Sequence, residues 1–546
     1  MKTHPRAGLK AIESDLIDCK KLENAYYNKK PLKDEKDTYV SFGTSGHRGS
    51  SLKSSFNELH IFAITLAIID FRKKNEINGP IFVGMDTHLL SKLAMQSVLQ
   101  VLSFHGIKTL TSEKEFVPTP ALSFAILKHN RTNSQDNLSD GIIITPSHNP
   151  PEDGGIKYNF THGGPSEESI TKFIENRANE ILFSGLVNFN EFRSQSYLMS
   201  DSISEYDFLT PYVSDLSNVI NFEKIKASNL KIAVDPMGGA GLKYWQKISD
   251  FYDLNIDIIN KKIDPQFSFM TLDKDGVIRM DCSSEYAMNS LLEHCEDYDL
   301  LLGNDPDFDR HGVATKAGLM KPNHFLSVCI DYLFKTRTEW NKISQNVGKT
   351  LVSSLMVDRV AKSNKLTVYE VPVGFKWFVK GLLNHEIGFA GEESAGASFL
   401  RLDGKTWTTD KDGIILCLLA AEIMAVEGIS PQTYYNSLEK KLGKSYYTRI
   451  HLTANKKQKD KLLNFLESNF KHKFLAEEKI TQVLTCAPGN NEKIGGIKIE
   501  TDNGWFVARP SGTEDFLKVY CESFISEDHL QKIIKGAEKI IYEIMH

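Results

Sequence analysis

Short apolar runs alternate with amphipathic segments along most of the chain. An apolar run at 80–84 is followed by helical periodicity from Ser91 to Phe104, which ends at Gly106. Later runs that predict strands, each followed by a Gly-, Asp- or Ser-containing loop and a helical segment, are Ile142–Ile144, Lys231–Val234, Leu300–Leu302, Thr350–Val352, Thr367–Glu370 and Gly388–Ala390. This βαβ rhythm predicts parallel sheets with helices on both faces.

The last hundred residues follow a different pattern. Gly496–Thr501 alternates apolar and polar residues, and Trp505–Arg509 is a second strand-like run. The residues between them, 502–504, contain Asn-Gly, which is typical of a β-hairpin turn. A third strand at Phe516–Glu522 and an amphipathic helix at Asp528–Met545 complete a small α+β domain.

The composition indicates several folded domains. A chain of 546 residues is too long for one hydrophobic core, so we expect three to five domains. Hydrophobic content of 41% and charged content of 25% are ordinary for a globular protein. The net charge of −5 and the pI of about 6.4 do not indicate nucleic acid or an anionic membrane surface as a partner.

The cysteines and the N-terminus indicate a cytoplasmic protein. Seven scattered cysteines without a CxxC pair give neither a disulfide framework nor a zinc site, and they fit a reducing compartment. The first residues lack the apolar segment of a signal peptide. The most apolar helix, Gly413 to Val426, is too short to span a bilayer, so we expect no membrane partner.

A serine comes shortly after the apolar run Ile142–Ile144. In Thr-Pro-Ser-His-Asn-Pro-Pro, at 145–151, the strand ends abruptly and leaves the hydroxyl of Ser147 at its carboxyl end. In open α/β sheets, ligands bind at that edge. Lys157 follows ten residues later, and a serine nucleophile near a cation suits phosphoryl transfer. The alternative is a proline-rich surface turn with an unused serine.

Three aspartates stand at alternate positions after another buried run. Asp305, Asp307 and Asp309 lie in Gly-Asn-Asp-Pro-Asp-Phe-Asp-Arg, and a second apolar run starts at Gly312. Three close carboxylates repel one another, and a divalent cation relieves the repulsion. Oxygen-only ligands favour Mg²⁺ over Zn²⁺. An acidic exposed turn is the alternative, which Arg310 and the flanking apolar runs disfavour.

The segment Arg-Pro-Ser-Gly-Thr-Glu at 509–514 is a candidate phosphate site. Arg509 can offer a bidentate fork to a phosphate. Ser511, Thr513 and the backbone N–H groups around Gly512 can form an anion-binding nest. An ordinary hydrogen-bonded turn explains the hexapeptide equally well.

Other loops carry further candidate side chains. Glu392 and Ser394 would point the same way in an extended chain and could grip sugar hydroxyls, although a capping turn is as good an explanation. A glycine-rich loop at 41–49 carries Arg48 but lacks the spacing of a nucleotide-binding P-loop. Lys376 stands at a strand-to-helix turn, where a lysine is usually exposed.

Taken in this order, the motifs resemble the α-D-phosphohexomutase family. The order is the loop with Arg48, the Ser147 loop, the aspartate triplet, the Gly-Phe-Lys and Glu-Glu-Ser segments, and then 509–514. The resemblance runs from about residue 5 to the C-terminus. It is strongest to the long bacterial phosphoglucomutases, at Arg279–Ser284 and Val371–Phe378. Pro306 and Asp515 depart from the common pattern without removing a chemical group.

The resemblance implies three related α/β domains, with mixed sheets sandwiched by helices, and a smaller C-terminal α+β domain. They would form a heart-shaped molecule around a central cleft. The implied limits are 1–40 for an N-terminal extension, 41–210 for the domain with the phosphoserine loop, 211–325 for that with the metal loop, 326–445 for that with the sugar loop and 446–546 for that with the phosphate-binding loop.

The resemblance also implies a role for each motif. Ser147 would carry a phosphoryl group, and Asp305, Asp307 and Asp309 would hold Mg²⁺ together with a phosphoserine oxygen. Phosphoryl transfer would take place among Arg48, His148 and Lys157, with Lys157 as general acid or base. The remaining substrate contacts would come from Thr44, Ser45, Arg310, Lys376, Glu392, Ser394, Arg509, Ser511, Gly512 and Thr513.

The implied reaction is the interconversion of α-D-glucose 1-phosphate and glucose 6-phosphate, an intramolecular phosphotransfer in carbohydrate metabolism. Glucose 1,6-bisphosphate would be the intermediate and activator. Phosphomannomutase and phosphoglucosamine mutase remain alternatives, because sugar preference depends on loop geometry. A Mg²⁺-dependent sugar phosphatase and a scaffold without chemistry are the competing classes. The expected partner is a small sugar phosphate, and the expected state is a monomer or homodimer.

Overall fold

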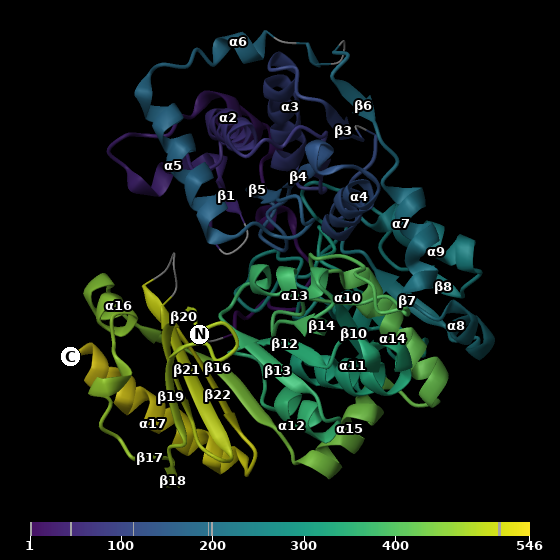
Figure 1. Ribbon diagram of the computed structural model, residues 1–546, viewed down its shortest axis with the longest axis vertical. Helices are drawn as coiled ribbons and strands as arrows, with labels where there is room; N and C mark the ends of the chain where they lie inside the picture. Colours follow the sequence, from purple (N-terminus) through teal and green to yellow (C-terminus); the bar gives the residue numbers. More distant parts are fainter. Residues whose placement is uncertain (1–2, 44–45, 113, 195, 198–199, 511–514) are drawn as a thin grey trace.

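Four large sheets, each packed against helices, organise the described part of the chain (Figure 1). The computed structural model describes residues 3–43, 46–112, 114–194, 196–197, 200–510 and 515–546. Within these residues, sheets of six, five, four and five strands follow one another along the sequence. We call the parts of the chain that carry them the first, second, third and fourth units. The first three units are α/β and the last is α+β, which confirms the predicted fold class.

The first unit is a sheet with helices on both faces. Its strands, in spatial order, are β1 (His47–Ser50), β5 (Asp153–Asn159), β4 (Asp140–Ile144), β2 (Ile81–Met85), β3 (Thr109–Thr111) and β6 (Ile203–Glu205). Its helices are α2 (Glu58–Lys74), α3 (Leu89–Phe104), α4 (Thr119–Thr132), α5 (Glu168–Ser184) and α6 (Asn190–Arg193). Along β4, Ile142 and Ile144 belong to the core with α2, α3 and α5, whereas Ile143 belongs to the core with α4. Side chains that alternate along a strand thus give each face an apolar layer.

The second and third units repeat this arrangement with fewer strands. In the second unit the strands, in spatial order, are β11 (Gly318–Leu319), β10 (Gly312–Thr315), β9 (Leu300–Gly303), β7 (Ile232–Asp235) and β8 (Ile256–Ile258). In the third unit they are β13 (Thr367–Val371), β12 (Asn346–Thr350), β14 (Ile387–Gly391) and β15 (Ala397–Phe399). The helices are α7 (Leu209–Asp215), α8 (Phe222–Ser228), α9 (Leu242–Tyr252), α10 (Asn289–Leu292), α11 (Pro322–Thr336), α12 (Met356–Ser363), α13 (Val379–Leu383), α14 (Gly413–Glu427) and α15 (Pro431–Leu442).

Two expectations about the strands were wrong. The βαβ rhythm predicts purely parallel sheets, but the sheets are mixed, as the family resemblance implies, because β5, β10 and β15 run antiparallel to their neighbours β4, β9 and β14. The run Thr350–Val352 is also not a strand, since β12 ends at Thr350. Leu351 and Val352 are apolar because they pack against Trp505 and Val507 of the fourth unit.

The fourth unit is an antiparallel sheet packed against helices, as the sequence predicts. Its strands, in spatial order, are β16 (Tyr446–Thr453), β22 (Phe516–Ser523), β21 (Gly504–Pro510), β20 (Lys493–Glu500) and β19 (Gln482–Cys486). The predicted hairpin joins β20 to β21, where Thr501 N donates to Gly504 O at 2.8 Å. The helices α16 (Lys456–Leu463) and α17 (Glu527–Met545) and the ribbon of β17 (Phe474–Leu475) and β18 (Glu478–Lys479) complete the unit.

The segment before residue 40 contacts both the first and the second unit. Gly8 N donates to Leu272 O at 2.7 Å, and Lys10 forms a β-bridge with Thr271 in the second unit. The helix α1 (Cys19–Asn28) buries Leu22 and Tyr26 in the core of the first unit. This segment therefore lies across the boundary between two units.

A buried ionic network joins the third and fourth units. The carboxylate of Glu370 on β13 contacts Lys349 Nζ of β12 at 3.0 Å and Lys498 Nζ of β20 at 2.7 Å. Both ammonium groups are almost fully buried, and Lys498 also contacts Glu500 at 2.5 Å. The carboxylate of Glu522, on β22, likewise accepts hydrogen bonds from the backbone and side chains of the third unit.

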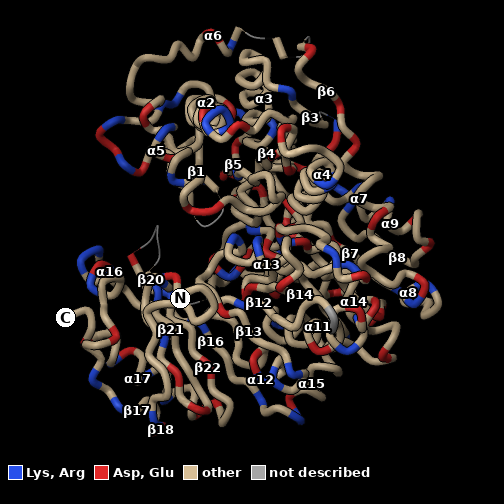
Figure 2. Tube along the Cα trace, in the orientation of Figure 1, with Lys and Arg blue, Asp and Glu red and all other residues tan. Residues whose placement is uncertain are grey.

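Charged residues of both signs are spread over the fold. Lys and Arg are interspersed with Asp and Glu along all four units (Figure 2). Among the described residues, no single helix is long and apolar enough to span a bilayer; α14 and α15 reach that length only as a pair bent by 74°.

Candidate active site

Ser147 lies just beyond the carboxyl end of β4, in a loop that holds it in an unusual backbone conformation. Its φ of 61° is in the left-handed region, which non-glycine residues seldom adopt and which is common at functional sites. The side chain is buried, and its Oγ donates to Asp305 Oδ2 at 2.8 Å. Ser147 Oγ also lies 3.5 Å from His148 Nδ1. The loop of the first unit therefore places this hydroxyl against the acidic loop of the second.

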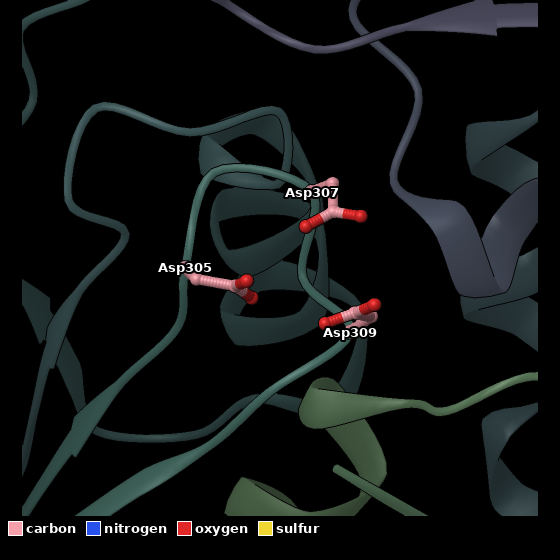
Figure 3. A group of neighbouring side chains, drawn as sticks. All are labelled: Asp305, Asp307 and Asp309. Carbon is pink, nitrogen blue, oxygen red and sulfur yellow. The ribbon is translucent and has the colours of Figure 1, made fainter. Parts of the chain in front are cut away.

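The three predicted aspartates form one cluster in the loop between β9 and β10. One carboxylate oxygen from each lies within 4.8 Å of the other two, and Figure 3 shows the three side chains turned toward a common space. Burial and repulsion from Asp307 and Asp309 raise the pKa of Asp305 well above its ordinary value. Among the described residues, Oδ1 of Asp307 and Oδ1 of Asp309 are buried without a hydrogen-bond partner. Three converging carboxylates with unpaired oxygens fit a hard divalent cation.

Ammonium groups from two other units surround this cluster. Lys157 Nζ, on β5, lies 2.6 Å from Asp307 Oδ2 and 3.3 Å from Asp309 Oδ2. Burial lowers the pKa of Lys157, but Asp307 and Asp309 outweigh burial and raise it above the ordinary value. Lys411 Nζ, from the loop before α14, lies 2.9 Å from Asp309. The raised pKa keeps Lys157 positively charged, and both side chains lie where they can neutralise a phosphoryl group.

His148 and Arg310 complete the surroundings of Ser147. Burial, reinforced by the positive charge of Arg310, lowers the pKa of His148 to about 3, so its imidazole is neutral. Arg310 Nε lies 3.8 Å from Asp305 and 3.7 Å from Asp309, at the margin of an ion pair. The guanidinium therefore retains donors for a ligand.

All four units line one cavity of about 540 Å³ above this centre. The predicted residues on its wall are Arg48, His148, Lys157, Asp309, Arg310, Glu392 and Ser394. Ser147, Asp305 and Asp307 are buried directly behind that wall. The structure therefore brings the predicted transfer centre and the predicted sugar loop to a single site.

The loop predicted to bind the sugar, at Glu392 and Ser394, is not extended. The prediction that these two side chains point the same way assumed an extended chain. Glu392 O accepts from Ala395 N at 3.1 Å, and Glu392 N donates to Gly396 O at 2.8 Å, so the chain makes a tight turn. The turn is needed because β14 and β15 are antiparallel neighbours. Both side chains still reach the cavity, and Glu392 Oε1 accepts from Gly374 N at 3.0 Å.

Two predicted substrate contacts are not among the described residues that line the cavity. The described lining of the cavity leaves out Lys376, which lies 3.6 Å from Glu168, and Arg509, whose Nε donates to Ile494 O at 3.1 Å. Five predicted residues lie outside the described part of the chain: Thr44, Ser45, Ser511, Gly512 and Thr513.

The sequence reasoning missed several residues of the cavity wall. Lys411 stands alone before a helix and gives no local signal. In the fourth unit, Arg449 and His451 alternate on β16 and face Tyr520 and Lys518 across the β16–β22 pair. Polar side chains at alternate positions of two paired strands mark one face of a sheet, and this signal was available in the sequence.

Comparisons with known proteins agree with this fold and site. Models of phosphoglucomutase/phosphomannomutase match the chain in four consecutive parts: α/β/α domain I at residues 40–184, domain II at 210–318, domain III at 321–442 and the C-terminal domain at 462–539. The fold and the site thus define an isomerase of the intramolecular phosphotransferase class. The chain belongs to the phosphoglucomutase/phosphomannomutase family.

Individual relatives extend the match to nearly the whole chain. A phosphoglucomutase of Komagataeibacter xylinus is 49% identical over 539 residues, which cover 98% of this chain and 97% of the relative. Phosphoglucomutase 2 of Saccharomyces cerevisiae is 25% identical and covers 94% and 96%. Among solved structures, the open form of the Paramecium phosphoglucomutase parafusin has a TM-score of 0.71 at 20% identity, covering 95% of each chain, and therefore shares the fold.

Proposed function

We propose that the chain is a phosphoglucomutase, which interconverts α-D-glucose 1-phosphate and glucose 6-phosphate through a phosphoserine at position 147. One observation carries the proposal. The Ser147 hydroxyl donates to Asp305 at 2.8 Å, so a nucleophile from one unit meets an acidic cluster from another. The relative from K. xylinus, a phosphoglucomutase 49% identical over nearly its full length, supports the choice of substrate.

The residues at this centre fit Mg²⁺ as cofactor. Asp305, Asp307 and Asp309 would hold the ion, with an oxygen of phosphoserine as a further ligand. When bound, Mg²⁺ supplies positive charge that stabilises the phosphoryl group during transfer. The ion would also relieve the mutual repulsion that raises the pKa of Asp305.

The protein's own groups would carry out the transfer. Ser147 Oγ attacks the phosphorus of the bisphosphate as its proton passes to Asp305 Oδ2, the acceptor of its hydrogen bond, and the bond from phosphorus to the sugar oxygen breaks. Lys157 is the candidate to give its proton to that oxygen, because it is charged and is held at the transfer centre by two carboxylates. Arg48, on the cavity wall, and the neutral His148 would orient the attacked phosphoryl group.

Substrate binding would use contacts common to two orientations of the sugar phosphate. A glucose 1,6-bisphosphate intermediate must turn over before it returns its other phosphate, so each end must fit the same cradle. Glu392 and Ser394 would hold the sugar and Arg509 the phosphate that is not transferred, with Arg310 and Lys376 as further contacts. Ser511, Gly512 and Thr513 are proposed for the same cradle, and Thr44 and Ser45 for the transfer side.

The proposal also covers the alternative sugar substrates and the cellular compartment. Phosphomannomutase and phosphoglucosamine mutase activities are the alternatives, since the family model covers both glucose and mannose phosphates. All seven cysteines are free thiols, which fits a reducing compartment such as the cytoplasm.

The test supplies glucose 1-phosphate, Mg²⁺ and a trace of glucose 1,6-bisphosphate, and measures glucose 6-phosphate and free phosphate in parallel. We expect glucose 6-phosphate without net phosphate release, and slower turnover of mannose 1-phosphate. Intact mass and peptide mapping should locate one phosphate on Ser147. Ser147→Ala should be inactive, whereas Ser123→Ala, a buried hydroxyl in α4 without a hydrogen-bond partner, should keep activity. Free phosphate as the main product, or an active Ser147→Ala enzyme, would overturn the proposal.

A further inference from the structure

A buried carboxylate outside both the described cavity lining and the aspartate cluster lies beneath the Ser147 loop. Asp86 directly follows β2, the strand next to β4 in the first sheet. Its Oδ1 accepts from His88 N at 3.0 Å and from Ser91 Oγ at 2.6 Å. Its Oδ2 accepts from His88 Nδ1 at 2.8 Å and from Thr145 Oγ1 at 2.7 Å. All four residues are buried, so four hydrogen bonds converge on one carboxylate away from water.

One of these bonds leads to the N-terminal side of the nucleophile. Ser147 N donates to Thr145 Oγ1 at 2.8 Å. A threonine hydroxyl has one proton, and a carboxylate can only accept. Because Asp86 takes that proton, the lone pairs of the Thr145 hydroxyl face the N–H of Ser147. Asp86 therefore orients the Thr145 hydroxyl so that its oxygen can accept from the backbone N–H of Ser147.

The other side of the nucleophile is held through His88. The two ring nitrogens of His88 face Asp86 Oδ2 and, at 3.1 Å, the carbonyl oxygen of Asn149. Both partners are acceptors, so both nitrogens carry a proton and the ring is an imidazolium. The buried carboxylate stabilises that charge. Asn149 is two residues beyond Ser147, just as Thr145 is two residues before it.

The backbone between these two points needs such support. Ser147 adopts a φ of 61°, which is unfavourable for a non-glycine residue unless its surroundings hold it. In this conformation of the loop its hydroxyl donates to Asp305. Hydrogen bonds at positions 145 and 149 fix the loop on both sides of the residue.

We propose that Asp86 is a positioning residue: through Thr145 and a protonated His88 it holds the Ser147 loop in the conformation that directs the nucleophile to the aspartate cluster. The proposal rests on Ser147 being the nucleophile. A purely structural role at the start of α3 would stabilise the fold without affecting phosphoryl transfer, so the two roles give different kinetics.

The test compares Asp86→Asn, Thr145→Val and Thr145→Ser in the full-length protein. Asp86→Asn offers an amide that cannot accept all four bonds, and Thr145→Val removes the hydroxyl at constant shape. Both should lower kcat about 10- to 100-fold with KM for glucose 1-phosphate within about twofold, because a displaced nucleophile slows the chemical step without removing substrate contacts. Thr145→Ser keeps the hydroxyl and should restore most of the rate. The double variant Asp86→Asn/Thr145→Val should be no slower than the worse single variant, since both act on one hydrogen-bonded chain.

A readout independent of turnover separates this proposal from the proposed function. Intact mass measures how fast glucose 1,6-bisphosphate transfers a phosphate to the dephosphorylated protein. If the wild-type protein gains no phosphate on Ser147, the proposed function fails. If the wild-type protein gains it and Asp86→Asn and Thr145→Val gain it at the same rate, the positioning role is refuted.

Asp140→Asn is the matched control. Asp140 is a fully buried carboxylate at the opposite end of β4, where Arg72 Nε lies 3.1 Å away. Its loss should lower the melting temperature but leave kcat and the rate of Ser147 phosphorylation within about twofold, as expected for a buried ion pair far from the chemistry. Equal losses of kcat in Asp140→Asn and Thr145→Val would show a general effect of core damage and refute the positioning role.

Discussion

Removing the charge of Glu370 should loosen the fourth unit from the third. In the buried network, burial raises the pKa of Glu370, but Lys349 and Lys498 outweigh burial and lower it from 4.5 to about 2. At about 1.4 kcal/mol for each pH unit, the carboxylate contributes about 3 kcal/mol at neutral pH. In Glu370→Gln, the carboxylates that remain beside the two ammonium groups among the described residues are Asp358, next to Lys349, and Glu500, next to Lys498. We therefore expect a loss of about 2–3 kcal/mol, near the lower end for breaking a buried ion pair.

Hydrogen exchange is the suitable measurement, because a chain of several units does not unfold in a single two-state step. Peptides that cover β20 and β13 should exchange about 30- to 150-fold faster in Glu370→Gln at pH 7. Because the folded-state pKa of Glu370 is lowered, its contribution is complete above pH 4.5 and is lost as the pH falls toward 2. The difference between the two proteins should therefore be constant from pH 8 to pH 5 and shrink below pH 4.5.

An exposed ion pair of the same unit provides the control. Glu477 lies 3.0 Å from Lys532, and both side chains are more than half exposed. Glu477→Gln should change stability by less than about 1 kcal/mol. If Glu370→Gln exchanged no faster than Glu477→Gln, the argument that the buried network holds the two units together would be wrong.

Three further predictions concern the site. Asp307→Asn should weaken Mg²⁺ binding and turnover, because one charged ligand is lost; EDTA-resistant activity in this variant would contradict a metal site. Arg509→Ala should raise KM for glucose 1-phosphate and glucose 6-phosphate alike, by an amount that corresponds to about 1.5–3 kcal/mol of lost binding free energy. An effect on one substrate only would rule out a shared phosphate cradle. Lys411→Met should lower kcat about 100-fold, because the variant lacks the ammonium group beside Asp309 that stabilises charge during transfer. An unchanged kcat in steady-state assays would show that Lys411 takes no part in transfer.

Local patterns in the sequence predicted the parts of this protein that local forces determine. The apolar run Ile142–Ile144 and the hairpin at 502–504 were recognisable because side-chain alternation and turn chemistry act within a few residues. The aspartate triplet was equally visible, since its three members lie in five consecutive residues. The predicted strand at Leu351 and Val352 was wrong because an apolar pair that packs on another unit has the same local pattern as a strand.

Contacts between distant segments were beyond such reasoning. Lys411 and Asp309 are about a hundred residues apart and meet only because four units close around one cavity. The turn at Glu392 depends on the antiparallel pairing of β14 with β15, and strand direction is not encoded in hydrophobic periodicity. The hydrogen bonds of Asp86 to Thr145 and His88 likewise depend on which strands are neighbours.

The segment before residue 40 has a consequence for protein engineering. The first family model begins at residue 40, so a shortened gene designed from it would omit α1 and the stretch that pairs with the second unit. Such a protein would have a hole where Leu22 and Tyr26 fill the core of the first unit, and an uncovered edge at Thr271. Poor yield or aggregation of that shortened protein would then reflect a missing structural part and would say nothing about its catalytic groups.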